Sequence, residues 1–230
     1  MRIAFATAAI AGSLSSVGWI QTAAAVPLPA GTTVALPGTT VALRPALAGV
    51  VFEDELQPFS FADATGHTLS GVVQSRVVKS DLDGTFDFYW RITALSSEQA
   101  AGRGPGSLSS FRLGGFGAYS LDADWRIDGL GSVGPTSAVR FPDPGFINFD
   151  FANPELQAGK DSYFFFLDSQ ATTYARVGLY DLVGTGGNGI SGQFETFAPT
   201  APVPEPAEWA LMLVGFGLIS RLAKAKRRPS

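Results

Sequence analysis

An alternation of apolar and polar residues with a period of two is the feature that most constrains the fold of this chain. In residues 86–93, Phe, Phe, Trp and Ile alternate with Asp, Tyr, Arg and Thr, and residues 147–151 alternate in the same way. A period of two places successive side chains on opposite faces of a β-strand, whereas a helix repeats every 3.6 residues. The chain is therefore expected to contain strands with one apolar face and one polar face.

Further strands are expected between turn-forming residues across residues 46–198. The apolar run at residues 163–167 predicts a more deeply buried strand. Glycine clusters and Asp-Gly or Pro-Gly pairs separate the segments at intervals typical of antiparallel strands. The other predicted strands cover residues 71–79, 107–113, 123–127, 137–141, 173–179 and 189–197.

These segments predict an all-β domain at residues 46–198. We expect an antiparallel β-sandwich that is jelly-roll-like, with a β-barrel as the alternative. The 18 Phe and 4 Trp residues supply apolar area for a core in a chain that has no cysteine. Each buried aromatic side chain removes about 150–250 Å² from water. No helix of ordinary length is expected outside the two ends of the chain.

The amino-acid composition excludes several kinds of catalytic and metal-binding site. The absence of cysteine excludes disulfides, thiol nucleophiles and zinc sites with thiolate ligands. His67 is the only histidine, so a multi-histidine metal site is excluded, and a Ser-His-Asp triad would have to use this residue in a predicted loop. No Gly-x-Ser-x-Gly motif occurs. We expect no catalytic residue, no metal site and no cofactor.

Two acidic groups could still suggest a site. Asp81 and Asp83 precede a glycine as in calcium loops, but the twelfth position of such a loop would be Ile92, which excludes an EF-hand. A hairpin turn is the favoured interpretation, and calcium binding at Asp81 and Asp83 stays open. The second group surrounds Trp125 and is expected to flank a buried ring; it comprises Asp122, Asp124 and Asp128. Aromatic residues that could stack on sugar rings are Tyr89, Tyr119, Trp125 and Tyr174.

The N-terminal residues predict export. Arg2 is followed by a long uncharged stretch, and Ala23 and Ala25 fit the small-residue pattern of a signal cleavage site. Residues 1–25 are therefore expected to be a signal peptide with a helical apolar region. Residues 26–45 contain Gly-Thr-Thr-Val-Ala-Leu twice in succession, at 31–36 and 38–43. Two copies are too few for a solenoid, so we expect a duplicated linker of low order, with an edge hairpin as the alternative.

The C-terminal residues 199–230 predict a proline-rich stalk, a membrane helix and a basic tail. The uncharged run at 209–220 has 12 residues, about 18 Å of helix against a hydrocarbon core of roughly 30 Å. Counting residues 207–225, with Arg221 and Lys224 reaching the headgroups, gives a helix that can span transiently. An amphipathic surface helix is disfavoured because the run has no polar face. The apolar helix residues are Trp209, Leu211, Met212, Leu213, Val214, Phe216, Leu218 and Ile219, and the tail that should stay cytoplasmic carries Arg221, Lys224, Lys226, Arg227 and Arg228.

The same C-terminal residues resemble a known sorting signal. Pro204-Glu205-Pro206, a Trp-Ala-Leu-Met start at residue 209, a Gly-Phe-Gly centre and the basic end together resemble the PEP-CTERM signal of Gram-negative bacteria. The resemblance implies that exosortase, a membrane processing enzyme, recognises Pro204, Glu205 and Pro206. It also implies transient anchoring in the inner membrane, followed by release to the cell surface or extracellular matrix of bacteria that make exopolysaccharide.

The net charge of the processed chain limits the partners that it can bind. Without both ends, ten basic residues stand against twenty acidic ones, a formal charge of −10. This argues against nucleic acid as a partner but not against neutral sugars. The expected function is that of an exported, non-enzymatic surface or exopolysaccharide-matrix component. A carbohydrate-binding module is the first alternative, and a glycan-active enzyme is the second.

Overall fold

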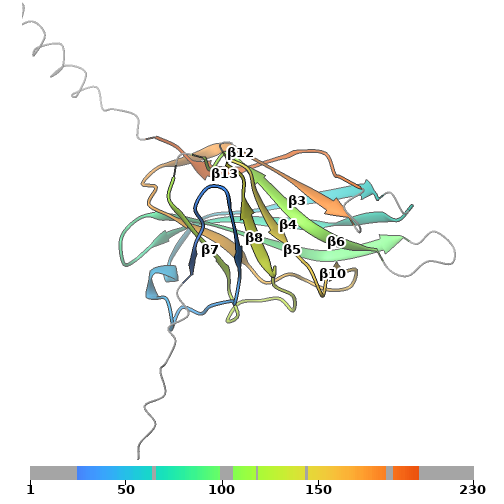
Figure 1. Ribbon diagram of the computed structural model, residues 1–230, viewed down its shortest axis with the longest axis horizontal. Helices are drawn as coiled ribbons and strands as arrows, with labels where there is room; N and C mark the ends of the chain where they lie inside the picture. The colour runs from blue at the N-terminus through green and yellow to red at the C-terminus, as the bar shows by residue number, and fades with distance from the viewer. Residues whose placement is uncertain are drawn as a thin grey trace, which may run out of the picture.

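The chain folds into β-strands joined by loops, with one short 3-10 helix, η1 (Pro45–Leu47) (Figure 1). The computed structural model describes residues 25–63, 66–98, 106–117, 119–142, 145–184 and 189–201. The strands are β1 (Val26–Pro27), β2 (Thr32–Ala35), β3 (Gly49–Ala62), β4 (Thr68–Ser80), β5 (Phe86–Glu98), β6 (Ser107–Gly114), β7 (Leu121–Trp125), β8 (Ser137–Arg140), β9 (Ile147–Asp150), β10 (Leu156–Gln157), β11 (Phe165–Ser169), β12 (Tyr174–Gly184) and β13 (Phe194–Pro199).

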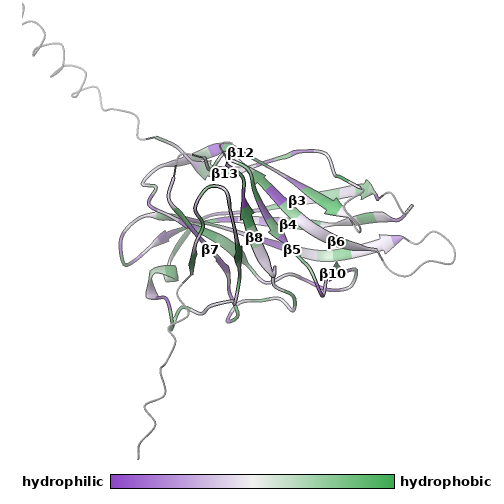
Figure 2. Ribbon diagram, in the orientation of Figure 1, coloured by the Kyte–Doolittle hydropathy of each residue, from purple (hydrophilic) through white to green (hydrophobic). Residues whose placement is uncertain are grey.

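The strands form two antiparallel sheets. Sheet A has the order β1-β7-β11-β5-β4-β3, and sheet B has the order β13-β12-β6-β9-β8-β2, with β10 paired to β6. Hydrophobic and hydrophilic residues are interspersed along the strands (Figure 2), and the buried apolar residues of both sheets form a common core. The prediction of an all-β antiparallel domain is confirmed, and the arrangement of the two sheets is sandwich-like.

Aromatic rings fill the space between the sheets. Phe165 on β11 lies 6.2 Å from the Trp90 ring on β5, between ring centroids, and 5.0 Å from Phe111 on β6. Phe149 and Phe151 contact the same ring at 4.9 and 5.9 Å. The five side chains are buried to within 1% of complete burial. Phe165 therefore joins the two sheets at the centre of the core.

One polar contact also joins the sheets. The Trp90 indole Nε1 donates a hydrogen bond of 3.0 Å to Thr196 Oγ1 on β13, and both residues are buried. A buried indole N–H without an acceptor would destabilise the fold, so this bond fixes the position of β13 over β5.

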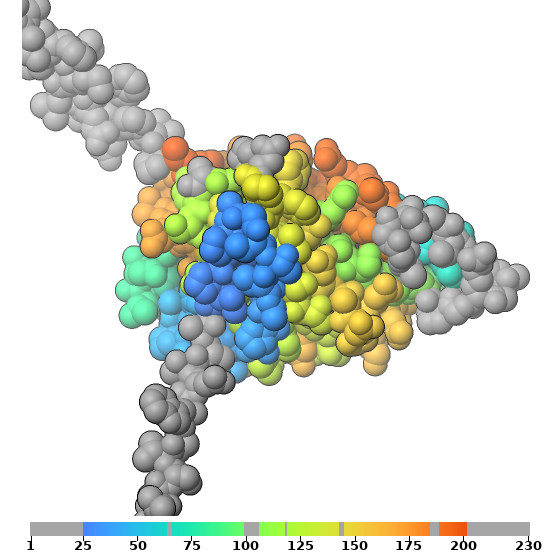
Figure 3. All heavy atoms as spheres, in the orientation of Figure 1, coloured from blue at the N-terminus to red at the C-terminus, as the bar shows by residue number. Residues whose placement is uncertain are grey.

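The prediction that residues 26–45 form a low-order linker is wrong. Val26 on β1 pairs with Ala123 in sheet A, and Thr33 on β2 pairs with Val139 in sheet B. Figure 3 shows these N-terminal residues, in blue, lying against the body of the domain. The segment is ordered because its apolar side chains, among them Leu28 at 1% exposure, are buried by strands distant in sequence. The alternative of an edge hairpin is also wrong, since β1 and β2 belong to different sheets.

The two copies of the repeat have different structures. The first copy forms β2 at the edge of sheet B, whereas the second pairs beside the end of β7, where Thr39 forms a parallel bridge with Arg126. The second copy lies within residues 36–48, hereafter the crossing segment. Gly38 begins the second copy at φ +80°, and a Cβ atom there would lie 2.7 Å from the Trp125 ring. Only glycine allows both this backbone conformation and this close approach.

The crossing segment buries the outer face of sheet A. Leu47 packs with Val78, Tyr89, Phe164 and Phe166 in a second, smaller core. The alternation in residues 86–93 correctly predicts that the Phe, Trp and Ile side chains face the main core. The opposite face of that strand was expected to be polar, but its Tyr89 is only 3% exposed because the second core covers it.

Several strand boundaries differ from those predicted, and two strands within residues 46–198, β3 and the short β10, were missed. β3 has fourteen residues and pairs with β4 along its whole length, but no strand was predicted there. It is an edge strand with many exposed residues, and the acidic run at residues 53–55 interrupts its apolar pattern. β12 extends to Gly184 beyond the predicted end at 179, and β13 begins at Phe194 rather than at 189.

The predicted signal helix and membrane helix lie outside the described residues. In the part of the chain that is described, no helix is long and apolar enough to cross a membrane. Ala25 is the first described residue and is 2% exposed, packed in the second core.

Candidate functional site

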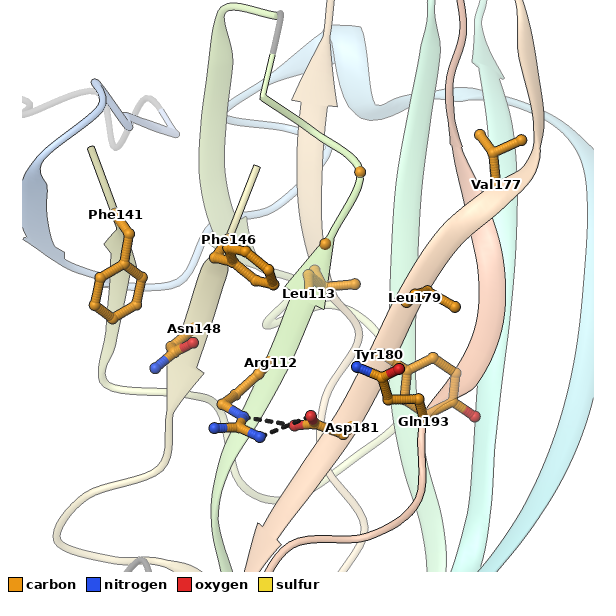
Figure 4. A pocket seen from close by; sticks show the side chains of 12 residues that line it. Arg112, Leu113, Phe141, Phe146, Asn148, Val177, Leu179, Tyr180, Asp181 and Gln193 are labelled. Carbon is orange, nitrogen blue, oxygen red and sulfur yellow. Dashed lines mark hydrogen bonds and ion pairs between the residues drawn. The ribbon is translucent and has the colours of Figure 1, made fainter. Parts of the chain in front are cut away.

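A hollow of about 570 Å³ lies on the outer face of sheet B (Figure 4). Strands β6, β9 and β12 form its floor, and the loops at their ends form its rim. We call it the sheet B hollow. It is lined by Arg112, Leu113, Gly114, Gly115, Phe141, Phe146, Asn148, Val177, Leu179, Tyr180, Asp181 and Gln193.

Strand register places the lining side chains in two neighbouring rows. Arg112 pairs with Asn148 on one side and with Asp181 on the other, which gives a polar row. Gly114 pairs with Leu179 two residues further along the same strands. Residues two apart share a face of a sheet, so the second row lies beside the polar one.

The second row is apolar and has a gap at its centre. Phe146 and Leu179 are 59% and 42% exposed, and Gly114 lies between them with no side chain. A Cβ atom on Gly114 would lie 3.6 Å from the Phe146 ring, at ordinary contact distance. The missing side chain therefore creates the depression without requiring an unusual backbone conformation.

Exposed apolar side chains gather around this gap. Phe141, at the end of β8, is 42% exposed, and its N–H donates a 3.0 Å hydrogen bond to the carbonyl of Phe146 before β9. Val177 on β12 is 58% exposed on the opposite side of the hollow. Figure 4 shows the two phenylalanine rings on one side and Val177 with Leu179 on the other. Gathered apolar groups on a concave surface are typical of binding sites.

The polar row holds a bidentate ion pair. Arg112 Nε donates to Asp181 Oδ1 at 2.5 Å, and Nη2 donates to Oδ2 at 2.7 Å. The hydrogen bonds to Asp181 raise the pKa of Arg112. Within the described residues, the Asn148 and Gln193 side-chain amides have no hydrogen-bond partner in the fold. They are free to donate to and accept from a ligand.

The acidic group around Trp125 has a structural role that the sequence did not indicate. Asp124 Oδ1 accepts 2.8 Å from the Gly38 N–H, and Asp128 Oδ2 accepts 2.9 Å from the Val41 N–H. Asp122 accepts a 2.9 Å hydrogen bond from Arg44. All three carboxylates thus hold the crossing segment on sheet A. Burial raises the pKa of Asp124 to about 6.

A row of carboxylates crosses sheet A beneath Arg44. Asp168 on β11 lies opposite Asp122 on β7, and Arg44 forms an ion pair with each of them. Asp87 on β5 is only 1% exposed. Its Oδ1 accepts a long hydrogen bond of 3.4 Å from the Ser169 N–H, whereas its Oδ2 has no hydrogen-bond partner among the described residues. Burial and the neighbouring charge of Asp168 raise the pKa of Asp87 to about 9.

The raised pKa of Asp87 predicts a pH-dependent stability. Between about pH 4 and pH 9 the folded protein holds a proton on Asp87 that the unfolded chain has lost. Stability should therefore fall as the pH rises through this window, by up to about 1.4 kcal/mol per pH unit. Asp87→Asn does not titrate and should flatten the profile, measured by urea unfolding at pH 5, 6.5 and 8. Asp81→Asn, in the exposed β4–β5 turn, is the control, and parallel profiles for wild type and Asp87→Asn would contradict the assignment.

The aromatic residues predicted to stack on sugars do not form a binding row. Tyr89 is buried, and the Trp125 ring stacks on Tyr163 with centroids 4.9 Å apart. Tyr174 Oη donates a 2.9 Å hydrogen bond to Glu53, and Tyr119 packs partly buried against the main core. The exposed rings of the sheet B hollow were missed. The available signal was the pair of phenylalanines that flank the turn at residues 142–145.

The other predicted residues are placed as follows. His67 is 5% exposed, with Nδ1 3.3 Å from Asp63 Oδ2, so this residue is buried beside an acid in the loop just before β4. Asp83 Oδ1 accepts hydrogen bonds from the Thr85 N–H at 3.0 Å and from Thr85 Oγ1 at 2.6 Å, which confirms the hairpin turn. Among the described residues, no group of three or more His, Cys, Asp or Glu side chains could hold a metal ion.

The sorting residues lie outside the described part of the chain. These are Pro204, Glu205, Pro206, the apolar run that follows them and the basic tail. Of the two predicted signal-cleavage residues, Ala23 also lies outside the described residues.

No protein-family model, curated protein or solved structure matches this chain.

Proposed function

We propose that this chain is an exported protein that is sorted through a PEP-CTERM signal and acts as a non-enzymatic surface or exopolysaccharide-matrix component. The observation that carries the proposal is the conjunction of Pro204-Glu205-Pro206, the apolar run at 209–220 and five basic residues after it. Two prolines fix an extended backbone around a single charge, which is a suitable recognition element beside a membrane.

The proposal includes the route of export. A signal helix at residues 1–25 would direct the chain through the inner membrane, and a C-terminal transmembrane helix would hold it there until exosortase cuts near Glu205. The ectodomain between them would be jelly-roll-like. The domain that remains outside would begin with β1, whose first residue is Val26.

The first test is fractionation of a Gram-negative host that carries an exosortase. The triple variant Pro204→Ala, Glu205→Ala, Pro206→Ala should accumulate in the inner-membrane fraction, whereas the wild-type chain should reach the surface or culture fluid. We expect the released amount of the variant to fall at least about tenfold, because the recognition element is lost while the membrane helix is kept. The variant Pro202→Ala removes a proline of the stalk but keeps the tripeptide, and it should be released normally.

The same fractionation in a host without exosortase completes the test. The wild-type chain should then behave as the triple variant does. Equal release of the wild-type chain with and without exosortase would contradict the sorting proposal.

The sheet B hollow favours a second candidate function, that of a carbohydrate-binding module. Its exposed phenylalanine rings and unpaired amides suit a ligand that offers both apolar faces and hydroxyl groups. This function is compatible with a role in a polysaccharide matrix.

A further inference from the structure

We infer that the sheet B hollow binds a neutral glycan chain, with sugar rings against Phe146 and Phe141 and sugar hydroxyls on the polar row of Asn148, Arg112 and Asp181. This inference deepens the carbohydrate-binding candidate and depends on the proposed export only for the compartment in which the glycan is met.

The dimensions of the hollow fit part of a chain rather than a large surface. Its volume of about 570 Å³ lies within the roughly 300–1,000 Å³ of small-molecule sites. Gly114 leaves a gap between Phe146 and Leu179 into which a ring can enter. A protein partner would instead need about 800 Å² of contact on each side, well beyond the two rows that line this hollow.

The apolar row supplies the faces on which a sugar ring can lie. Phe146 is 59% exposed and Phe141 is 42% exposed, and both belong to the β8–β9 hairpin end. Leaving two large rings in water is unfavourable, and covering them with the C–H face of a sugar removes apolar area from water. The backbones of the two residues are joined by the hydrogen bond from the Phe141 N–H to the Phe146 carbonyl, so the two rings start from fixed, neighbouring positions.

The polar row supplies matched hydrogen-bonding groups. Asp181 holds the Arg112 guanidinium in a fixed plane through two hydrogen bonds, and Arg112 Nη1 has no acceptor within the described residues. The amides of Asn148 and Gln193 can each donate and accept. Hydroxyl groups also donate and accept, so a sugar can satisfy this row without an unpaired polar group.

Charge selects among glycans. Among the described residues that line the hollow, Arg112 is the only cation, and Asp181 neutralises it. The processed domain carries ten basic against twenty acidic residues. An acidic polysaccharide would be repelled by this field, whereas a neutral one would not. The ligand is therefore assigned to the neutral class.

The test is affinity electrophoresis of the protein as isolated from its host, processed or intact in detergent. The gels contain a neutral β-glucan, a galactomannan, the host's own exopolysaccharide or the polyanion polygalacturonate. At least one of the first three should retard the wild-type protein. Phe146→Ala should weaken that retardation roughly 5- to 10-fold, the loss expected for one aromatic contact and its buried area.

Two further variants separate ligand contact from folding. Gly114→Val fills the gap with a strand-compatible residue and should also weaken binding, whereas Phe52→Ala removes a ring of similar exposure, 51%, from sheet A and should not. Thermal unfolding of each variant verifies that it is folded.

Two results would overturn the inference. One is retardation by none of the three glycans, with or without retardation by the polyanion, and the other is equal retardation of Phe146→Ala, Gly114→Val and wild type. The mass of the isolated protein reports sorting separately, so failed sorting and failed binding are distinguishable.

Discussion

Replacing Arg44 with alanine is expected to destabilise the β domain by about 3–5 kcal/mol, the loss typical when one partner of a buried ion pair is removed. The Arg44 side chain is 16% exposed and forms ion pairs with Asp122 and Asp168. Without this cation, the carboxylates of Asp168 and Asp122, which lie opposite each other on β11 and β7, would have no compensating charge. The crossing segment would also lose one of its anchors to sheet A.

The measurement is urea unfolding followed by tryptophan fluorescence at pH 7.5 and pH 4.5. The loss should be smaller at pH 4.5, where the carboxylates left behind by Arg44→Ala are closer to protonation and repel one another less. Arg176→Ala is the matched control, because Arg176 also faces two acids, Glu55 and Glu195, but is 41% exposed. It should cost at most about 1 kcal/mol. Equal losses for the two variants would contradict a structural role of the buried pair.

Replacing Phe165 with alanine is expected to cost about 3–5 kcal/mol, because it leaves a cavity where both sheets meet. Phe165 is completely buried and contacts the rings of Trp90, Phe111, Phe149 and Phe151. The fluorescence of Trp90 should also report the loss of its stacked partner.

The control for this variant is Phe146→Ala. Phe146 is 59% exposed on the outer face of sheet B, so its loss should change the free energy of unfolding by only about 0.5 kcal/mol. Phe165→Leu should lie between the two because it keeps part of the volume. A loss below about 1 kcal/mol for Phe165→Ala would show that the core can collapse around the gap.

Local pattern was sufficient to predict the inner layer of this fold. Alternation in residues 86–93 and 147–151 identifies the side chains that meet in the main core, since a period of two is a property of each strand by itself. Pattern did not predict β3, because its acidic run breaks the alternation and its order comes from pairing with β4. Edge strands commonly carry such charges, which discourage pairing with other chains.

The outer layer of sheet A depends on contacts that local pattern does not contain. The duplicated repeat is rich in glycine and threonine, which is typical of a linker. The crossing segment that contains its second copy is nevertheless held by Asp124, Asp128 and Asp122, from more than seventy residues away. The three carboxylates are visible in the sequence, but their partners are backbone N–H groups and Arg44, which no pattern around Trp125 reveals.

The sheet B hollow was unpredictable for a related reason. It exists because strand register brings Gly114 between Phe146 and Leu179, and register between distant strands is not encoded in any one segment. The aromatic residues chosen from sequence were tyrosines and a tryptophan, which the fold uses for internal packing and hydrogen bonds. Exposure, rather than residue type, distinguishes the candidate ligand-binding rings.

The most direct test of the proposed sorting is the intact mass of the wild-type protein recovered from culture fluid, together with sequencing of both of its ends. The account predicts a chain that has lost residues 1–25 and everything after the region of Pro204-Glu205-Pro206. Recovery of a chain that retains Arg227 and Arg228 would contradict it, because release would then occur without removal of the C-terminal signal.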